Sequence, residues 1–210
     1  MYSQTLDIGG YREILLVRHG ATDANAAGKY SGLTDLPLSD LGREQIELRR
    51  QELVDHGLSS WFDASTDLNL ICSPLKRCLL TTKLLWPDCK PIIEPALIET
   101  NFGSWEGMTY DQLKDDPAYR SWLDASPEHR PAPPGGESGE DILLRLEHFW
   151  SNELDLSKQN NSSERLAIVT HGGVIMYLMS LITGIPEEFY SWQLKPGGAW
   201  LLTSEGYQLC

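Results

Sequence analysis

Two histidines, each at the end of an apolar run and each followed by glycine, stand out in this sequence. His19 follows the apolar run ILLV in the segment ILLVRHG, and His171 follows the run LAIV in the segment LAIVTHGG. Runs of this length and composition predict buried strands, and open α/β folds bind ligands at the carboxyl ends of their strands. Arg18 precedes His19 and brings a cation to the same edge as an ionisable nucleophile. This combination predicts a site that handles an anion.

The flanking residues support a functional interpretation over a structural one. Gly20 follows His19, and Gly172 and Gly173 follow His171, so we expect the backbone to approach a ligand closely at both places. A single histidine after a strand is more often a hydrogen-bonded structural residue. Two in matched surroundings are harder to explain by packing, because an arginine at the end of a buried strand calls for an anionic partner.

Three further polar residues follow predicted strands or lie in the first loop. Arg77 lies three residues past Pro74, which ends a second apolar run. Glu99 comes after a short strand predicted at 91–93, and Asn25 in the first loop is able to donate an amide hydrogen bond. Pairs of arginines bind phosphate through bidentate, charge-assisted hydrogen bonds. The predicted ligand is therefore a phosphate group.

The elements that position these residues alternate between strands and helices. The predicted strands are 14–17, 67–74, 91–93 and 166–170, the predicted helices are 40–56, 75–86, 109–124, 139–153 and 173–183, and residues 189–209 form one or two closing strands. This alternation predicts a three-layer α/β/α fold with a mostly parallel central sheet and helices on both faces.

We expect one domain over residues 1–210, with a short lid-like insertion at about 100–140 over the active edge. The proline- and glycine-rich stretch 126–138 is interpreted as a loop, because periodic elements resume after it. Within the insertion, Trp105, Tyr119 and Trp122 are expected to pack together rather than to contact a substrate ring. Glu137 and Glu140 are expected on a solvated face.

Composition limits the partners. The hydrophobic share of 41% and the charged share of 22% are typical of a soluble globular protein. No apolar run is long enough to span a membrane, and the N-terminal stretch lacks the pattern of a signal peptide. A cytoplasmic protein is expected. The net charge of −13 repels nucleic acid, whereas a small phosphorylated metabolite suits a pocket in which arginines reverse the local field. The sequence does not fix the oligomeric state.

Cysteine spacing predicts no metal site. Cys72, Cys78, Cys89 and Cys210 form neither a C-x-x-C pair nor a Cys/His ligand pattern. Cys72 and Cys78 are expected to be reduced, buried and structural. No cofactor is expected either.

Four motifs in order resemble the histidine phosphatase superfamily in its phosphoglycerate mutase-like branch. They are RHGATDAN at 18–25, SPLKRC at 73–78, Glu99 ahead of FGSWEG at 102–107, and THGG at 170–173. The resemblance spans residue 14 to about residue 185. One departure is Ala21, which stands where the family often has glutamate or glutamine. This change affects the pocket rim and not the nucleophile.

The resemblance implies a role for each matched residue. His19 accepts the phosphoryl group, for which one imidazole nitrogen must be unprotonated and the other must donate to a fixed acceptor. Glu99 enters protonated, gives its proton to the leaving alkoxide and then activates water. The phosphate pocket comprises Arg18, Asn25, Arg77 and a protonated His171, together with Gly20, Thr22 and Gly172.

The short insertion and the early end of the chain favour a phosphatase over a mutase, because water reaches the phosphohistidine. The stretch GKYSGLTDLPLSDLGREQ at 28–45 resembles α-ribazole phosphatases, which implies α-ribazole 5′-phosphate as substrate, in assembly of the nucleotide loop of cobalamin. Three alternatives within the superfamily stay open: a broad-specificity sugar-phosphate phosphatase, a fructose-bisphosphatase-type enzyme and a phosphoglycerate mutase-like enzyme.

Two rivals belong to other classes. A non-catalytic phosphate- or phosphoprotein-binding module would be expected to have lost at least one of His19, Glu99 and His171. A metal-dependent hydrolase that uses both histidines as ligands lacks a third ligand at any recognised spacing. The sequence therefore favours a metal-independent phosphomonoesterase.

Overall fold

The computed structural model describes residues 6–63, 67–160 and 164–210, and a mixed six-stranded sheet lies at the centre of this part of the chain. The strand order is β3-β2-β4-β1-β5-β6. The strands are β1 (Glu13–Arg18), β2 (Leu68–Cys72), β3 (Ile92–Ile93), β4 (Arg165–Thr170), β5 (Ala199–Thr203) and β6 (Gly206–Leu209). The four strands from β3 to β1 run parallel, and the hairpin of β5 and β6 adds two antiparallel strands.

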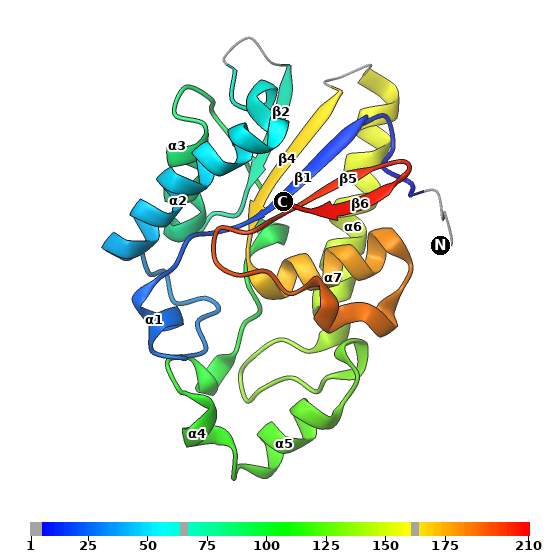
Figure 1. Ribbon diagram of the computed structural model, residues 1–210. Coiled ribbons are helices and arrows are strands. Elements are labelled where there is room, and N and C mark those ends of the chain that lie inside the picture. The colour runs from blue at the N-terminus through cyan, green and yellow to red at the C-terminus, as the bar shows by residue number, and fades with distance from the viewer. Residues whose placement is uncertain (1–5, 64–66, 161–163) are drawn as a thin grey trace.

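Helices cover both faces of the sheet, with α2 and α3 on one side and α6 and α7 on the other (Figure 1). The helices are α1 (Asp23–Ala26), α2 (Asp40–Leu53), α3 (Lys76–Leu85), α4 (Tyr110–Leu113), α5 (Pro117–Asp124), α6 (Gly139–Asn160) and α7 (Gly172–Thr183). The predicted three-layer α/β fold with a mostly parallel sheet is confirmed. No helix in the described part of the chain is both long enough and apolar enough to cross a membrane.

The alternating side chains of β1 explain why a continuous apolar run forms a strand here. Ile14 and Leu16 point into the core beneath α6 and α7, and Leu15 and Val17 point into the core beneath α2 and α3. All four side chains are fully buried. Successive side chains of a strand face opposite sides, so a strand between two helical layers must be apolar on both.

Two predicted helices differ from the structure. The single helix predicted at 109–124 is wrong, because the chain forms α4 and α5 with a break before Pro117. Asp116 caps α5 by accepting a hydrogen bond from the amide of Ala118 at 2.8 Å, and proline suits the first position of a helix. The helix predicted at 139–153 continues to Asn160, since the polar stretch that follows contains neither glycine nor proline.

The insertion has a small core of its own. Trp105, Leu113, Tyr119 and Trp122 are buried against one another, and the Tyr119 hydroxyl lies 2.6 Å from that of Tyr30 in the first loop. In Figure 1 the segment with α4 and α5, drawn in green, lies beyond the end of the sheet near α1. The expectation that these aromatic residues pack together is confirmed.

Candidate active site

The register of the sheet brings the two histidines together. β1 and β4 pair in parallel with Arg18 opposite Thr170, so His19 and His171 leave adjacent strands at the same level. Their ring centroids are 5.1 Å apart in an edge-to-face arrangement, and both side chains are buried. The carboxyl edge of the sheet is therefore the place where polar groups meet, as the sequence indicates.

His19 is held as a neutral imidazole with one nitrogen free to attack. Its Nδ1 lies 2.6 Å from the carbonyl oxygen of Gly20, which only accepts, so Nδ1 carries the hydrogen and Nε2 carries the lone pair. Burial lowers the pKa of His19 to about 3, and the nearby charges of Arg77 and Arg18 add to this effect against the hydrogen bond to Gly20.

Gly20 contacts both His19 and the helical layer behind it. Its amide donates to Oγ1 of Thr81 at 3.0 Å, and its carbonyl receives the hydrogen of His19. A Cβ at this position would lie 2.7 Å from Cγ1 of Ile46 and 2.9 Å from the carbonyl oxygen of Gly42. The close approach that the glycine permits within the chain is to α2, and its place in the phosphate pocket stays a prediction.

Both ring nitrogens of His171 have partners within the chain. Arg77 donates from Nε to Nδ1 at 3.2 Å, which leaves the ring hydrogen on Nε2, where it points to the hydroxyl of Ser73 at 2.8 Å. Burial holds the pKa of His171 well below its usual value, and His19 and Arg77 lower it further. In the chain alone these effects favour the neutral form of His171, and its protonation beside a bound phosphate stays a prediction.

Arg77 is a buried cation held by backbone oxygens. It is 1% exposed, and its guanidinium donates to the carbonyl oxygens of Thr34 at 2.9 Å and Gly32 at 2.8 Å as well as to His171. None of the ion pairs in the described part of the chain includes Arg77. Burying a cation without a carboxylate is costly, and an anion bound at this edge offsets that cost.

Arg18 approaches the same place from β1. Its Nη1 donates to the carbonyl oxygen of Leu194, and its Nε is buried without a hydrogen-bond partner in the described residues. A Cβ at Gly172 would lie 3.1 Å from the guanidinium carbon, so glycine is the residue that lets Arg18 lie over the start of α7. Burial lowers the pKa of Arg18, the charge of Glu99 opposes the shift, and Arg77 adds to it.

Glu99 sits at the N-terminus of α7. Its carboxylate accepts hydrogen bonds from the amide of Gly173 at 3.3 Å and from its neighbour Thr100 at 3.0 Å. A Cβ at Gly173 would lie 2.6 Å from Oε1 of Glu99. The second glycine after His171 thus makes room for the carboxylate, which explains why two glycines follow this histidine.

Asn25 and Thr22 form a capping box at the start of α1. Oδ1 of Asn25 accepts hydrogen bonds from the amide and the hydroxyl of Thr22, each at 3.0 Å, and this leaves the amide nitrogen of Asn25 to donate elsewhere. Within the described residues, neither side chain is hydrogen-bonded to His19 or to the arginines. Their phosphate-binding role stays a prediction.

Glu106 is a residue that the sequence analysis missed. Its carboxylate accepts hydrogen bonds from the amides of Gly32 and Leu33, both at 2.9 Å, and from the amide and hydroxyl of Thr34. The carbonyl groups of this same loop hold the guanidinium of Arg77. The only signal was its place in the FGSWEG motif, because the contact joins residues more than seventy positions apart.

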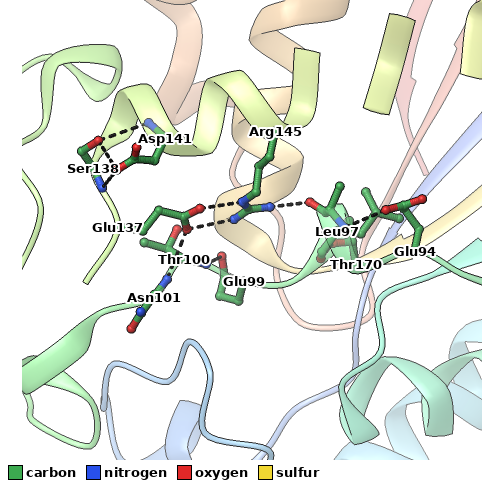
Figure 2. Close-up of polar contacts among 11 residues, drawn as sticks. Glu94, Leu97, Glu99, Thr100, Asn101, Glu137, Ser138, Asp141, Arg145 and Thr170 are labelled. Atoms are coloured by element: carbon green, nitrogen blue, oxygen red, sulfur yellow. Dashed lines mark hydrogen bonds and ion pairs between the residues drawn. The ribbon is translucent and has the colours of Figure 1, made fainter. Parts of the chain in front are cut away.

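Glu137 and Arg145 steady the segment that carries Glu99. Figure 2 shows the ion pair between them beside that segment, with Glu137 also accepting a hydrogen bond from the amide of Asn101. The Arg145 Nε to Glu137 Oε1 distance is 2.7 Å, and Arg145 also donates to the carbonyl oxygen of Ala96. Both side chains are 18% exposed. The expectation of a solvated face is therefore wrong for Glu137, since its ion-pair partner lies eight residues further on, in α6.

Within residues 6–63, 67–160 and 164–210, no three histidine, cysteine, aspartate or glutamate side chains gather as a metal site. The four cysteines are free, and Cys72 and Cys78 are buried as expected. Sγ of Cys78 lies 3.5 Å from Nε2 of His171, on the floor of the site.

We expect the buried neutral His19 to make stability fall in acid. The unfolded side chain has a pKa of about 6.5 and the folded one about 3, so between these values the unfolded chain binds more protons and unfolding becomes easier as the pH drops. From pH 7 to pH 4.5, His19 alone removes about 2–3 kcal/mol. Urea unfolding at both pH values should show a larger loss for wild type than for His19→Asn. Equal losses would contradict the burial of a neutral ring.

Catalysis by a neutral, positioned histidine among buried arginines is the chemistry of enzymes that break phosphoric monoesters. The comparison with known families agrees. A model of the histidine phosphatase superfamily (branch 1) matches residues 14–208, and the chain belongs to this superfamily.

Similar proteins are named phosphatases. The glucosyl-3-phosphoglycerate phosphatase of Mycolicibacterium vanbaalenii is 31% identical over 191 residues, 89% of this chain and 80% of that protein. The adenosylcobalamin/alpha-ribazole phosphatase of Escherichia coli K12 is 32% identical over 177 residues, 82% of this chain and 80% of that protein. The crystal structure of a putative alpha-ribazole-5′-P phosphatase from E. coli K-12 superimposes with a TM-score of 0.76 at 26% identity and 95% coverage of both chains. The present chain is likewise a phosphatase.

Proposed function

We propose that this chain hydrolyses small phosphomonoesters through a phosphohistidine on Nε2 of His19, with water as the final acceptor and without a metal ion. The observation that carries this proposal is the hydrogen bond from Nδ1 of His19 to the carbonyl oxygen of Gly20. It fixes which nitrogen bears the lone pair, and the pKa of about 3 keeps that nitrogen unprotonated at physiological pH.

In the first step Nε2 of His19 attacks phosphorus, and the bond from phosphorus to the ester oxygen breaks. Arg18 and Arg77 stabilise the charge on the equatorial oxygens, because both guanidinium groups lie at this edge without carboxylate partners in the described chain. Protonated Glu99 gives its proton to the leaving oxygen, so a neutral alcohol departs. The amide of Asn25, the Thr22 side chain and the first amides of α7, beginning at Gly172, supply further donors to the phosphate.

In the second step Glu99, now a carboxylate, takes a proton from water. The water oxygen attacks phosphorus, the bond from nitrogen to phosphorus breaks, and His19 returns to its neutral form as inorganic phosphate leaves. His171 acts here as a positioning residue, since its lone pair on Nδ1 receives the Nε hydrogen of Arg77 and its own hydrogen goes to Ser73.

The candidate substrates differ in their leaving groups. α-Ribazole 5′-phosphate, which the sequence favours, is supported by the name of the E. coli relative, and its leaving group is an uncharged nucleoside. The mycolicibacterial relative is named for a glycerate phosphate, whose leaving group carries a carboxylate. Sugar phosphates and fructose bisphosphate complete the panel that should be assayed with EDTA present.

The mechanism predicts a covalent phosphoenzyme. Rapid mixing with ³²P-labelled p-nitrophenyl phosphate in EDTA, followed by an alkaline quench, should leave label on a peptide containing His19, because phosphohistidine survives alkali and is lost in mild acid. Turnover that EDTA abolishes, without labelled protein, would favour a metal-dependent hydrolase. Phosphate binding without turnover or label would favour the binding module.

A further inference from the structure

A cavity of about 260 Å³ opens beside the site. Glu99 and Gly173 line one end, and aromatic side chains from the insertion and from the segment after α7 line the rest. This volume is below the roughly 300–1,000 Å³ typical of pockets for drug-sized ligands. Since Glu99 is the proposed donor to the leaving oxygen, the cavity is where the leaving alcohol would lie.

Arg130 is the one cation among the residues that line this cavity. It is 8% exposed, and its guanidinium carbon lies 4.1 Å from the ring centroid of Trp122. Nη2 donates to the hydroxyl of Tyr190, while Nε is buried with no hydrogen-bond partner in the described residues. None of the ion pairs in that part of the chain includes Arg130. A buried guanidinium of this kind calls for an anion.

Trp122, one of the aromatic residues that line the cavity, already has partners within the chain. Trp122 already contacts the guanidinium of Arg130, and the ring of Tyr119 lies nearly parallel to it at 6.0 Å. The Trp122 ring is thus engaged within the chain, and the Arg130 guanidinium lies against it at the wall of the cavity. Such a planar group matches a carboxylate through paired hydrogen bonds.

Glu99 and Arg130 line the same cavity. Gly173, which contacts Glu99, lies one helical turn before Tyr177 on α7, about 6 Å along the axis. Burial raises the pKa of Tyr177 to about 12, and the charge of Arg130 and a hydrogen bond from it oppose this shift, so the two side chains are neighbours. A small leaving alcohol that receives the Glu99 proton therefore lies in the same cavity as the Arg130 guanidinium.

We infer that Arg130 binds a carboxylate on the leaving alcohol, so that the preferred substrates are phosphomonoesters of small hydroxy acids. This inference rests on the proposed function, because it assigns the alcohol side of the same site. It favours substrates of the glycerate type over α-ribazole 5′-phosphate, whose nucleoside has no carboxylate and is large for this cavity.

A matched pair of substrates tests the inference. 3-Phosphoglycerate and glycerol 3-phosphate differ in one group, a carboxylate against a hydroxymethyl. We expect wild type to prefer 3-phosphoglycerate in kcat/KM, and Arg130→Gln to reduce the ratio of the two kcat/KM values about 10- to 100-fold. Arg130→Lys, which keeps the charge but not the planar fork, should give an intermediate ratio. Arg120→Gln removes an equal charge from the exposed face of α5 and should leave the ratio unchanged.

Binding separates the subsite from the chemistry. In a His19→Ala background, which removes the nucleophile, the Kd for 3-phosphoglycerate should rise about 10- to 100-fold on adding Arg130→Gln, with little change for glycerol 3-phosphate. If wild type hydrolyses nothing in the panel, the proposed function fails, and these Kd values still decide the subsite. Three results would overturn the carboxylate subsite. They are an equal loss of affinity for both ligands in Arg130→Gln, no wild-type preference for 3-phosphoglycerate over glycerol 3-phosphate, and a higher wild-type kcat/KM for α-ribazole 5′-phosphate than for 3-phosphoglycerate.

Discussion

Replacing His19 by alanine should lower phosphate release about 10⁴- to 10⁶-fold. The mechanism routes every turnover through Nε2 of this residue, and no second nitrogen in the described site is placed to substitute for it. The nearest ring, His171, has both nitrogens bound by Arg77 and Ser73. Water attacking phosphorus directly would retain only the stabilisation that the arginines provide.

The measurement is initial-rate release of inorganic phosphate from p-nitrophenyl phosphate and 3-phosphoglycerate, each with EDTA. His148→Ala, at an exposed position of α6, makes the same substitution away from the site and should keep wild-type rates. A midpoint of urea unfolding close to that of wild type at pH 7 shows that the loss is chemical. A His19→Ala enzyme with a tenth of the wild-type rate would refute the phosphohistidine route.

The sequence was sufficient to find the centre of the site because that centre depends on backbone topology. His19 and His171 each follow a buried apolar run, and the parallel pairing of the two strands then forces them onto one edge. Arg77 joins them because it lies in the first turn of α3, the helix that follows the neighbouring strand β2. Hydrophobic periodicity, the ends of strands and the order of elements along the chain are properties of the sequence itself, so they predict the position of these residues without a structure.

The residues that hold these groups could not be read in the same way. Glu106 orders the loop at 32–34 from across the molecule, and the pairing of Glu137 with Arg145 depends on how the proline-rich loop meets α6. Arg130 lies in a stretch whose composition predicts only a loop. A carboxylate or guanidinium in a loop has the same local signature whether it is solvated or buried, and only packing distinguishes the two.

Charge shows the same contrast between the whole chain and the site. The chain carries a net charge of −13, which repels anions at a distance. Arg18 and Arg77 at the edge of the sheet, and Arg130 in the neighbouring cavity, reverse this field locally, and none of the three has an ion-pair partner in the described residues. The association rate of anionic substrates is therefore expected to depend only weakly on salt concentration, because the attraction begins only within the pocket.

Glu99→Gln should separate the two chemical steps. Glutamine keeps the shape of the side chain, but it neither donates an acidic proton nor accepts one from water. With glycerol 3-phosphate the poor alkoxide leaving group makes the first step limiting, and we expect a loss of about 10²- to 10⁴-fold without a burst. With p-nitrophenyl phosphate the phenol leaves without a proton, so the first step survives and the second becomes slow.

The aryl ester should therefore give a rapid burst of nitrophenol equal to the amount of enzyme, followed by slow turnover, as phosphorylated His19 accumulates. Stopped-flow absorbance measures the burst, and alkaline quenching measures the phosphoenzyme. Glu140→Gln, at an exposed position in the first turn of α6, should behave as wild type on both esters. If Glu99→Gln slowed both esters equally with no burst, Glu99 would act by orienting Arg18 and the start of α7 rather than by moving protons. Its contacts with Gly173 make that the specific alternative, and the two esters distinguish it from acid–base catalysis.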